Sequence, residues 1–151
     1  MSNVVDLKLV NFERLQEVAD KYPQVAEKYV GQAIQRALLR VMGAAKKEAP
    51  MGVTGFLAGK WNIKMERFTG SLVSGSEHAV YVHNGTKPHW APIDPLAKWA
   101  KRKGLNPYAV RNSIAMKGTR ANPFLRRAVD QEVENIDKEL DKGIKDILAN
   151  I

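Results

Sequence analysis

The sequence of 151 residues carries 24 Lys or Arg against 16 Asp or Glu, a formal net charge of +8, with 44% hydrophobic residues and no Cys. This length predicts one domain with its own core, and the composition is that of a globular protein. The absence of Cys excludes disulfides, thiolate metal sites and a thiol nucleophile. No apolar run is long enough to cross a membrane, and the first ten residues lack the layout of a secretory signal.

The first half of the sequence is predicted to be a short strand followed by two helices. Val5, Leu7 and Leu9 alternate with polar residues, which is the pattern of a strand. Residues 11–21 have a helical pattern that ends before a Pro. Residues 24–48 give the clearest helix, because apolar residues recur there at spacings of three and four: Val30, Ile34, Ala37, Leu38, Val41 and Ala45.

The period changes to strict alternation after this helix. An apolar residue at every second position predicts a half-buried strand over residues 61–65. Residues 71–76 and 79–82 are short apolar pieces that we expect to pair with it as further strands. Asn84 and Gly85 form a tight-turn signal, since both residues tolerate positive φ.

Residues 87–118 are predicted to be an insertion of two short helices. Asp94 and Asn106 each precede a Pro and stand where an N-cap is expected. Gly104 and Gly118 follow as the two stop signals.

A long helix is predicted to begin at Asn122-Pro123, with its apolar residues on one face: Leu125, Val129, Val133, Ile136, Leu140 and Ile147. The order of elements predicts a single α+β domain over residues 1–151. A small antiparallel sheet packs against the long helix of the N-terminal half and the long C-terminal helix, with the helical pair 87–118 inserted between them.

Four short motifs follow one another in a recognisable order. Ala49-Pro50 ends the long helix, and Thr54-Gly55-Phe56-Leu57 leads into the strands. The Tyr81 to Thr86 loop and the Asn122 to Leu125 helix start come next. In this order and spacing the chain resembles the siphophage minor tail-component family, known from the gene-product-ten proteins of lambda-like phages. The Pro88 to Pro92 stretch is similar to an extended subset of that family.

The resemblance implies a structural, non-enzymatic protein of a tailed-phage virion, with no cofactor. Its expected place is the neck at the head–tail junction, where it completes the tail or connects it to the head. Expected partners are copies of itself in a ring, a hexamer by the common arrangement, and the head-closure protein, tail terminator or tail tube. Contact with genomic DNA in the channel is a further expectation. Assembly is expected in the host cytoplasm, with no membrane contact. Family members often have Glu where this chain has His83 or Asn84.

Several motif residues are expected to determine the fold rather than to act on a ligand. Gly supplies turn conformations that other residues resist, and Pro sets a helix end or start. The apolar residues anchor the last helix on the sheet. The set is Pro50, Gly55, Leu57, Gly85, Pro123, Phe124 and Leu125.

Patterns of catalytic and metal-binding residues are weak in this sequence. His83, His89 and Asp94 are close along the chain, but their spacing matches no tight metal motif. No nucleophile elbow, phosphate-binding glycine loop or convincing carboxylate pair is present. We therefore expect neither an enzyme nor a resident metal.

Charge is distributed unevenly along the chain. Residues 87–127 hold ten basic residues and one acid, whereas residues 128–151 hold three basic residues and seven acids. One interpretation is a nucleic-acid-binding module that uses segment 87–127, because aromatic residues are interleaved with the cations. Another is a solvated helical surface. A third is a ring in which the basic segment faces the acidic helix of a neighbour.

The residues expected at contacts with partners come from the loop, the insertion and the last helix. Loops carried by a rigid scaffold are where such contacts usually lie. The set is Tyr81, His83, Asn84, Thr86, Lys87, His89, Trp90, Lys101, Arg102, Lys103, Arg111, Asp130 and Glu134.

Overall fold

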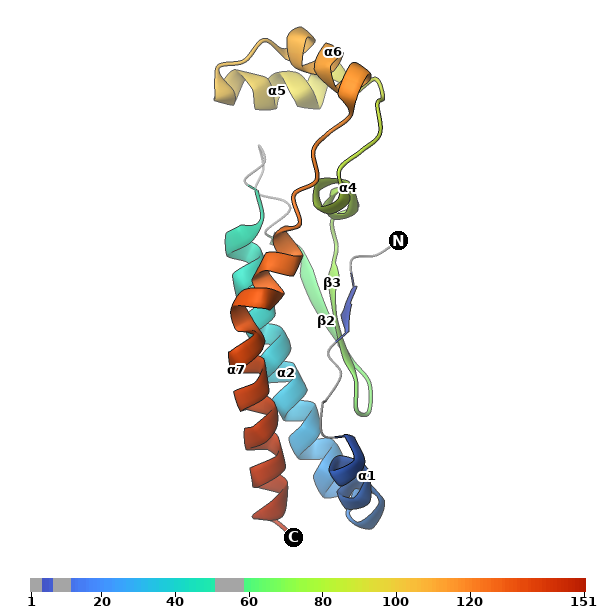
Figure 1. The fold of residues 1–151 in the computed structure, drawn as a ribbon, viewed down its shortest axis with the longest axis vertical. Coiled ribbons are helices and arrows are strands. Elements are labelled where there is room, and N and C mark those ends of the chain that lie inside the picture. Colours follow the sequence, from blue (N-terminus) through green and yellow to red (C-terminus); the bar gives the residue numbers. More distant parts are fainter. Residues whose placement is uncertain (1–3, 7–11, 51–58) are drawn as a thin grey trace.

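The computed structural model of the chain describes residues 4–6, 12–50 and 59–151, and it confirms the α+β class. Figure 1 shows a long body with a pair of short helices carried beyond one end. The described elements are β1 (Val4–Asp6), α1 (Phe12–Lys21), α2 (Pro23–Glu48), β2 (Trp61–Met65), β3 (Gly70–Ser74), α4 (His78–Asn84), α5 (Ile93–Lys103), α6 (Pro107–Lys117) and α7 (Phe124–Leu148).

Helix α2 is the centre of the body, between the sheet and α7. The two long helices run antiparallel along most of their length, and α7 packs mainly on α2 rather than on the sheet (Figure 1). The predicted apolar face of α2 is confirmed, because all six of its residues are buried. On α7 the predicted face is correct except at Val133, which is 45% exposed.

The sheet has the strand order β1-β3-β2, and both pairs are antiparallel. In the β2–β3 pair, Ile63 lies opposite Leu72 and Met65 lies opposite Gly70. The N-terminal strand is confirmed over Val4–Asp6, whereas Leu7 and Leu9 lie outside the described residues. The described residues also exclude Asn11, Gly55 and Leu57.

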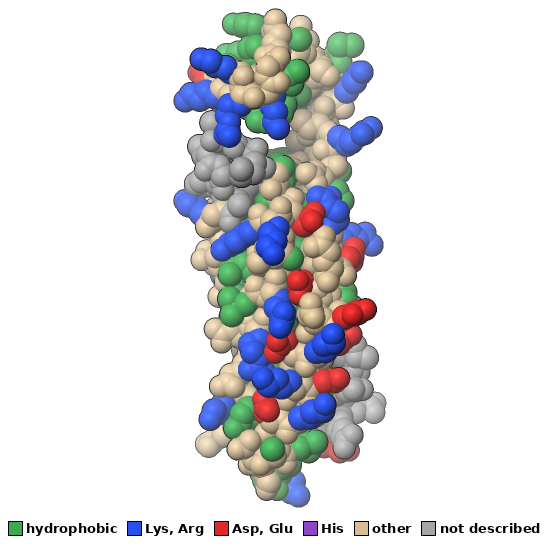
Figure 2. All heavy atoms as spheres, turned by 90° about the vertical axis from the view of Figure 1, so that its left-hand side faces the viewer, with side chains coloured by type: hydrophobic (Ala, Val, Ile, Leu, Met, Phe, Trp, Pro, Cys, Tyr) green, Lys and Arg blue, Asp and Glu red, His purple; other side chains and the backbone are tan. Residues whose placement is uncertain are grey.

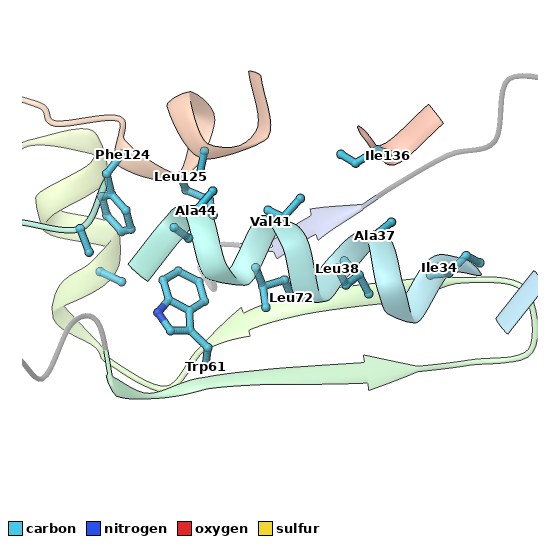
Figure 3. Close-up of a cluster of buried hydrophobic side chains, with 14 of the residues drawn as sticks. Ile34, Ala37, Leu38, Val41, Ala44, Trp61, Leu72, Phe124, Leu125 and Ile136 are labelled. Carbon is cyan, nitrogen blue, oxygen red and sulfur yellow. The ribbon is translucent and has the colours of Figure 1, made fainter. Parts of the chain in front are cut away.

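The core lies where the sheet, α2 and the start of α7 meet. Leu72 from β3 and Leu38 and Val41 from α2 are fully buried there. Figure 3 shows Trp61 of β2 beneath α2, with Phe124 at the end of the cluster. The Trp61 and Phe124 rings meet edge to face, with centroids 6.3 Å apart. Phe124 therefore anchors α7 on the sheet, as the sequence predicts.

The prediction of a strand over residues 79–82 is wrong, because this segment belongs to helix α4. Ala79 and His83 lie one helical turn apart, and the helix buries Ala79 while the His83 ring contacts Phe124. A four-residue apolar run fits the repeat of a strand and the repeat of a helix equally well. The segment is helical because this form lets it pack against the start of α7.

The starts of the later helices are only partly as predicted. Asp94 is not an N-cap, because α5 already begins at Ile93; its carboxylate lies in the first turn, where the helix dipole favours it. Asn106 does cap α6, since its side chain accepts hydrogen bonds from the backbone N–H groups of Tyr108 and Ala109. Asn122 does not cap α7, although that helix begins within two residues of it.

Candidate functional site

Residues 85–122 form an arm that leaves the body at α4 and returns to it at α7. Two extended segments, 85–92 and 118–122, make a stalk, and the α5–α6 hairpin sits at its end (Figure 1). The predicted insertion of two short helices is thus confirmed. Gly104 has the left-handed conformation at the end of α5, and the backbone N–H of Leu105 closes that helix by donating to the carbonyl of Ala100.

A β-bridge between Thr86 and Thr119 joins the two segments of the stalk. Each backbone N–H donates to the carbonyl of the other residue at 3.1 Å. The two hydroxyl oxygens lie 2.9 Å apart, and Thr86 Oγ1 also lies 3.3 Å from His89 Nδ1. Where the stalk meets the body, the backbone N–H of Asn122 donates to the carbonyl of Val82 in α4. The Thr86–Thr119 bridge and the Asn122–Val82 hydrogen bond join residues more than thirty positions apart.

Two glycines allow the stalk segments to come this close. Gly85 and Gly118 both have positive φ, and they flank the bridge from either side. A Cβ atom on Gly85 would lie 2.5 Å from the carbonyl oxygen of Thr119, and one on Gly118 would overlap the carbonyl oxygen of Thr86. Gly85 therefore determines the fold as predicted, and Gly118 does so as well as ending α6.

Gly118→Ala is expected to open the stalk locally. The substitution adds about 1–2 kcal/mol of backbone strain at positive φ, besides the overlap. Hydrogen exchange at the Thr86 and Thr119 amides should accelerate by roughly 5- to 30-fold. Gly104→Ala is the matched control, because Gly104 has φ +68 but no atom lies within 4 Å of its added Cβ. Equal acceleration in both variants would contradict this role of Gly118.

An apolar cleft of about 1090 Å³ lies between α4, the stalk and the near side of the hairpin. Its apolar lining comes mostly from the arm, with Leu96, Trp99, Val110 and Ile114. Lys87, His89 and Arg120 place polar groups among the residues that line it. The cleft exists because the stalk holds the hairpin away from the body.

The predicted contact residues fall in separate places. Lys101, Arg102 and Lys103 are at the tip of α5, whereas Asp130 and Glu134 are on the outer side of α7. The prediction of a loop over Tyr81 to Thr86 is wrong for its first four residues, because α4 extends to Asn84. Six others therefore lie in α4 or in the first segment of the stalk: Tyr81, Asn84, Thr86, Lys87, His89 and Trp90. His83 is different, because its ring packs edge to face on Phe124 with centroids 5.7 Å apart.

Arg111 and Trp90 form a contact that sequence reasoning did not foresee. The Arg111 guanidinium carbon lies 5.0 Å from the centre of the Trp90 ring, which is 66% exposed. Such a cation–π contact holds both side chains in place.

His83 belongs to the joint between α4 and α7. Burial lowers the pKa of its imidazole, and the positive charge of Arg127 lowers it further. The ring is therefore neutral at neutral pH. Among the described residues no His, Asp or Glu side chains cluster in a group of three that would hold a metal, so His83, His89 and Asp94 do not converge.

Ion pairs bind α7 to α2. Glu139 accepts from Arg36 at 2.8 Å and from Arg40 at 3.1 Å, and the first of these hydrogen bonds is the main cause of its lowered pKa. Glu48 likewise accepts from Arg127 at 2.8 Å, which lowers the pKa of that carboxyl. Part of the charge of the acidic C-terminal segment is thus neutralised within the chain.

Comparison of the chain with family models, with curated proteins and with solved structures finds no match. No helix in the described ranges is long and apolar enough to cross a membrane.

Proposed function

We propose that the chain is a structural, non-enzymatic component of a tailed-phage virion. It acts in the neck at the head–tail junction, where it completes the tail or connects it to the head by assembling into a ring. The order of the Ala-Pro, Tyr-to-Thr and Pro-Phe-Leu motifs supports this assignment, through the resemblance to the minor tail-component family. The head-closure protein, the tail terminator or the tail tube is the expected neighbour.

The observation that carries the assembly part of the proposal is the extent of exposed surface. The chain exposes 10187 Å². A compact monomer of its mass, 16.9 kDa, exposes roughly 7,700 Å². Obligate interfaces bury roughly 1,000–2,500 Å² on each partner, so the excess of roughly 2,500 Å² on one copy is large enough for such an interface.

Much of the exposed apolar surface is on the arm and beside it. Leu105 is 47% exposed, Tyr108 63% and Met116 75%, while Tyr81 on α4 is 60% exposed. The cleft adds further apolar side chains. The gathering of large exposed apolar side chains on one part of the molecule favours contact with another protein there. In a ring, each copy presents its arm to a different patch on the next copy.

The assembly is tested by the solution mass of the purified protein, measured by light scattering at low and high salt. We expect a mass several times 16.9 kDa, a hexamer by analogy, with little effect of salt because the arm contacts are apolar. Met116→Gln on the arm should reduce the mass, whereas Leu148→Gln at the other end of α7 serves as the control. A monomer at every protein concentration would contradict self-assembly by the free chain.

A further inference from the structure

The arm carries almost the whole net charge of the protein. Residues 85–122 contain eight Lys or Arg and one acid, Asp94, for a net charge of +7 out of the total of +8. The remaining residues, three quarters of the chain, are therefore close to neutral. Figure 2 shows blue side chains gathered over the hairpin, whereas blue and red alternate along the body below it.

Five of the eight cations of the arm are exposed and have no ion pair among the described residues. Lys98, Lys101 and Lys103 on α5 are exposed, as are Lys117 and Arg120 near the stalk. Across the described part of the chain none of these five has a carboxylate within ion-pair distance. On the body, by contrast, four Arg side chains form ion pairs with carboxylates: Arg36, Arg40, Arg67 and Arg127.

The two long helices of a second copy do not offer a strongly acidic surface. The acids of α7 lie beside the basic residues of α2, and together the two helices carry ten Lys or Arg and nine Asp or Glu. Glu139, one of these acids, is already held by Arg36 and Arg40. This mixture of charges makes the long helices of a neighbouring copy a weaker partner for the cations of the arm than a ligand with dense negative charge.

The arrangement of the arm favours phosphates over bases. On α5, Lys98 and Lys101 are one turn apart, so both cations lie along one side of the helix. Trp90 and Tyr108 are the two strongly exposed aromatic residues of the arm, and the Arg111 guanidinium covers one face of the Trp90 ring, so few open rings accompany the many cations. A single-strand binding site needs open aromatic platforms, whereas contact with a duplex backbone needs cations spaced along a rigid element.

We propose that the arm binds the phosphate backbone of duplex DNA, without preference for base sequence. The stalk holds the hairpin clear of the body, so that its cations can approach a duplex. The sequence-based interpretation assigned nucleic-acid binding to segment 87–127. The structure narrows the binding region to residues 85–122, because Arg127 lies on the body and pairs with Glu48 there. The proposal does not depend on ring assembly and can hold for a monomer.

The test is a salt titration of binding to a fluorescent duplex of about 20 base pairs, with NaCl from about 50 to 200 mM. The arm variant combines Lys98→Gln, Lys101→Gln and Lys103→Gln. The control removes the same charge from the body with Lys47→Gln, Lys138→Gln and Lys142→Gln, all of which are exposed. Far-UV circular dichroism and light scattering show whether either variant has changed its fold or its mass.

We expect the slope of log affinity against log salt to fall by about 2.7 in the arm variant, or about 0.9 for each phosphate contact, and to stay unchanged in the control. Affinity for the duplex at low salt should fall at least about tenfold in the arm variant alone. Two duplexes of unrelated sequence should bind equally.

Three results would overturn the proposal. Equal slope changes in both variants would mean that DNA responds only to the overall charge of the protein. Tighter binding of a single strand of the same length would assign the arm to bases. Displacement of the duplex by polyglutamate at the same charge concentration would make an acidic protein the preferred partner. The light-scattering result is read separately, so loss of DNA binding and loss of assembly remain distinguishable.

Discussion

Replacing Phe124 by Ala is expected to lower the free energy of unfolding by about 3–5 kcal/mol, the usual cost of removing a buried aromatic side chain. Phe124 has no exposed surface. Its ring contacts Trp61 of β2 edge to face and His83 of α4 in the same manner. One side chain therefore joins the sheet, α4 and the first turn of α7, and the surrounding residues come from too many elements to collapse into the cavity.

The measurement is urea denaturation followed by circular dichroism, with the midpoint and slope fitted together. Phe124→Leu keeps most of the volume and should cost less than about 1.5 kcal/mol. Met116→Ala removes a side chain that is 75% exposed and should change stability by less than about 0.5 kcal/mol. A loss below about 1 kcal/mol in Phe124→Ala would mean that the ring is not the anchor of α7.

This substitution also bears on the arm. The chain leaves the arm at Asn122, and Phe124 follows two residues later as the first residue of α7. Arg127 then donates to Asn122 at 2.8 Å and to Glu48 at 2.8 Å, which fixes the return of the stalk against the end of α2. Loss of the Phe124 ring should therefore loosen the base of the arm as well as the core.

Local signals in the sequence were sufficient for most of the secondary structure. Helix α2 is 26 residues long with a continuous apolar face, so its period is unambiguous. Asn106 and Gly104 act through their own neighbours, and both were predicted correctly. Helix α4 was missed because it has only seven residues, and its helical form depends on a ring that lies about forty positions later in the chain.

The candidate site was predictable in its composition but not in its geometry. The excess of Lys and Arg over residues 87–127 is visible in the sequence. Its separation from the body is not, because the stalk depends on hydrogen bonds between Thr86 and Thr119, which are 33 residues apart. Nor does the sequence indicate that Glu139 meets Arg36 and Arg40 of α2. Such pairings depend on the register between α2 and α7.

That register gives the second large prediction, at Gly143. This residue is buried on α7, and a Cβ atom added to it would lie 2.7 Å from the Cβ of Ala33 and 3.3 Å from the carbonyl oxygen of Tyr29. In an isolated helix Ala is more stable than Gly by about 1 kcal/mol. Here the close approach of α2 reverses the sign, so Gly143→Ala is expected to destabilise the fold by about 1–3 kcal/mol.

Gly43→Ala provides the matched control for this comparison. Gly43 is also within a long helix, but nothing lies within 4 Å of its added Cβ, so the substitution should stabilise the protein by about 0.5–1 kcal/mol. Urea denaturation of both variants under the same conditions measures the difference. If both substitutions stabilised the protein, α7 could not lie as close to α2 at Gly143 as the structure describes. Opposite signs would show that Gly143, which weakens the helix by propensity, stabilises the fold because it lets α2 and α7 approach each other closely.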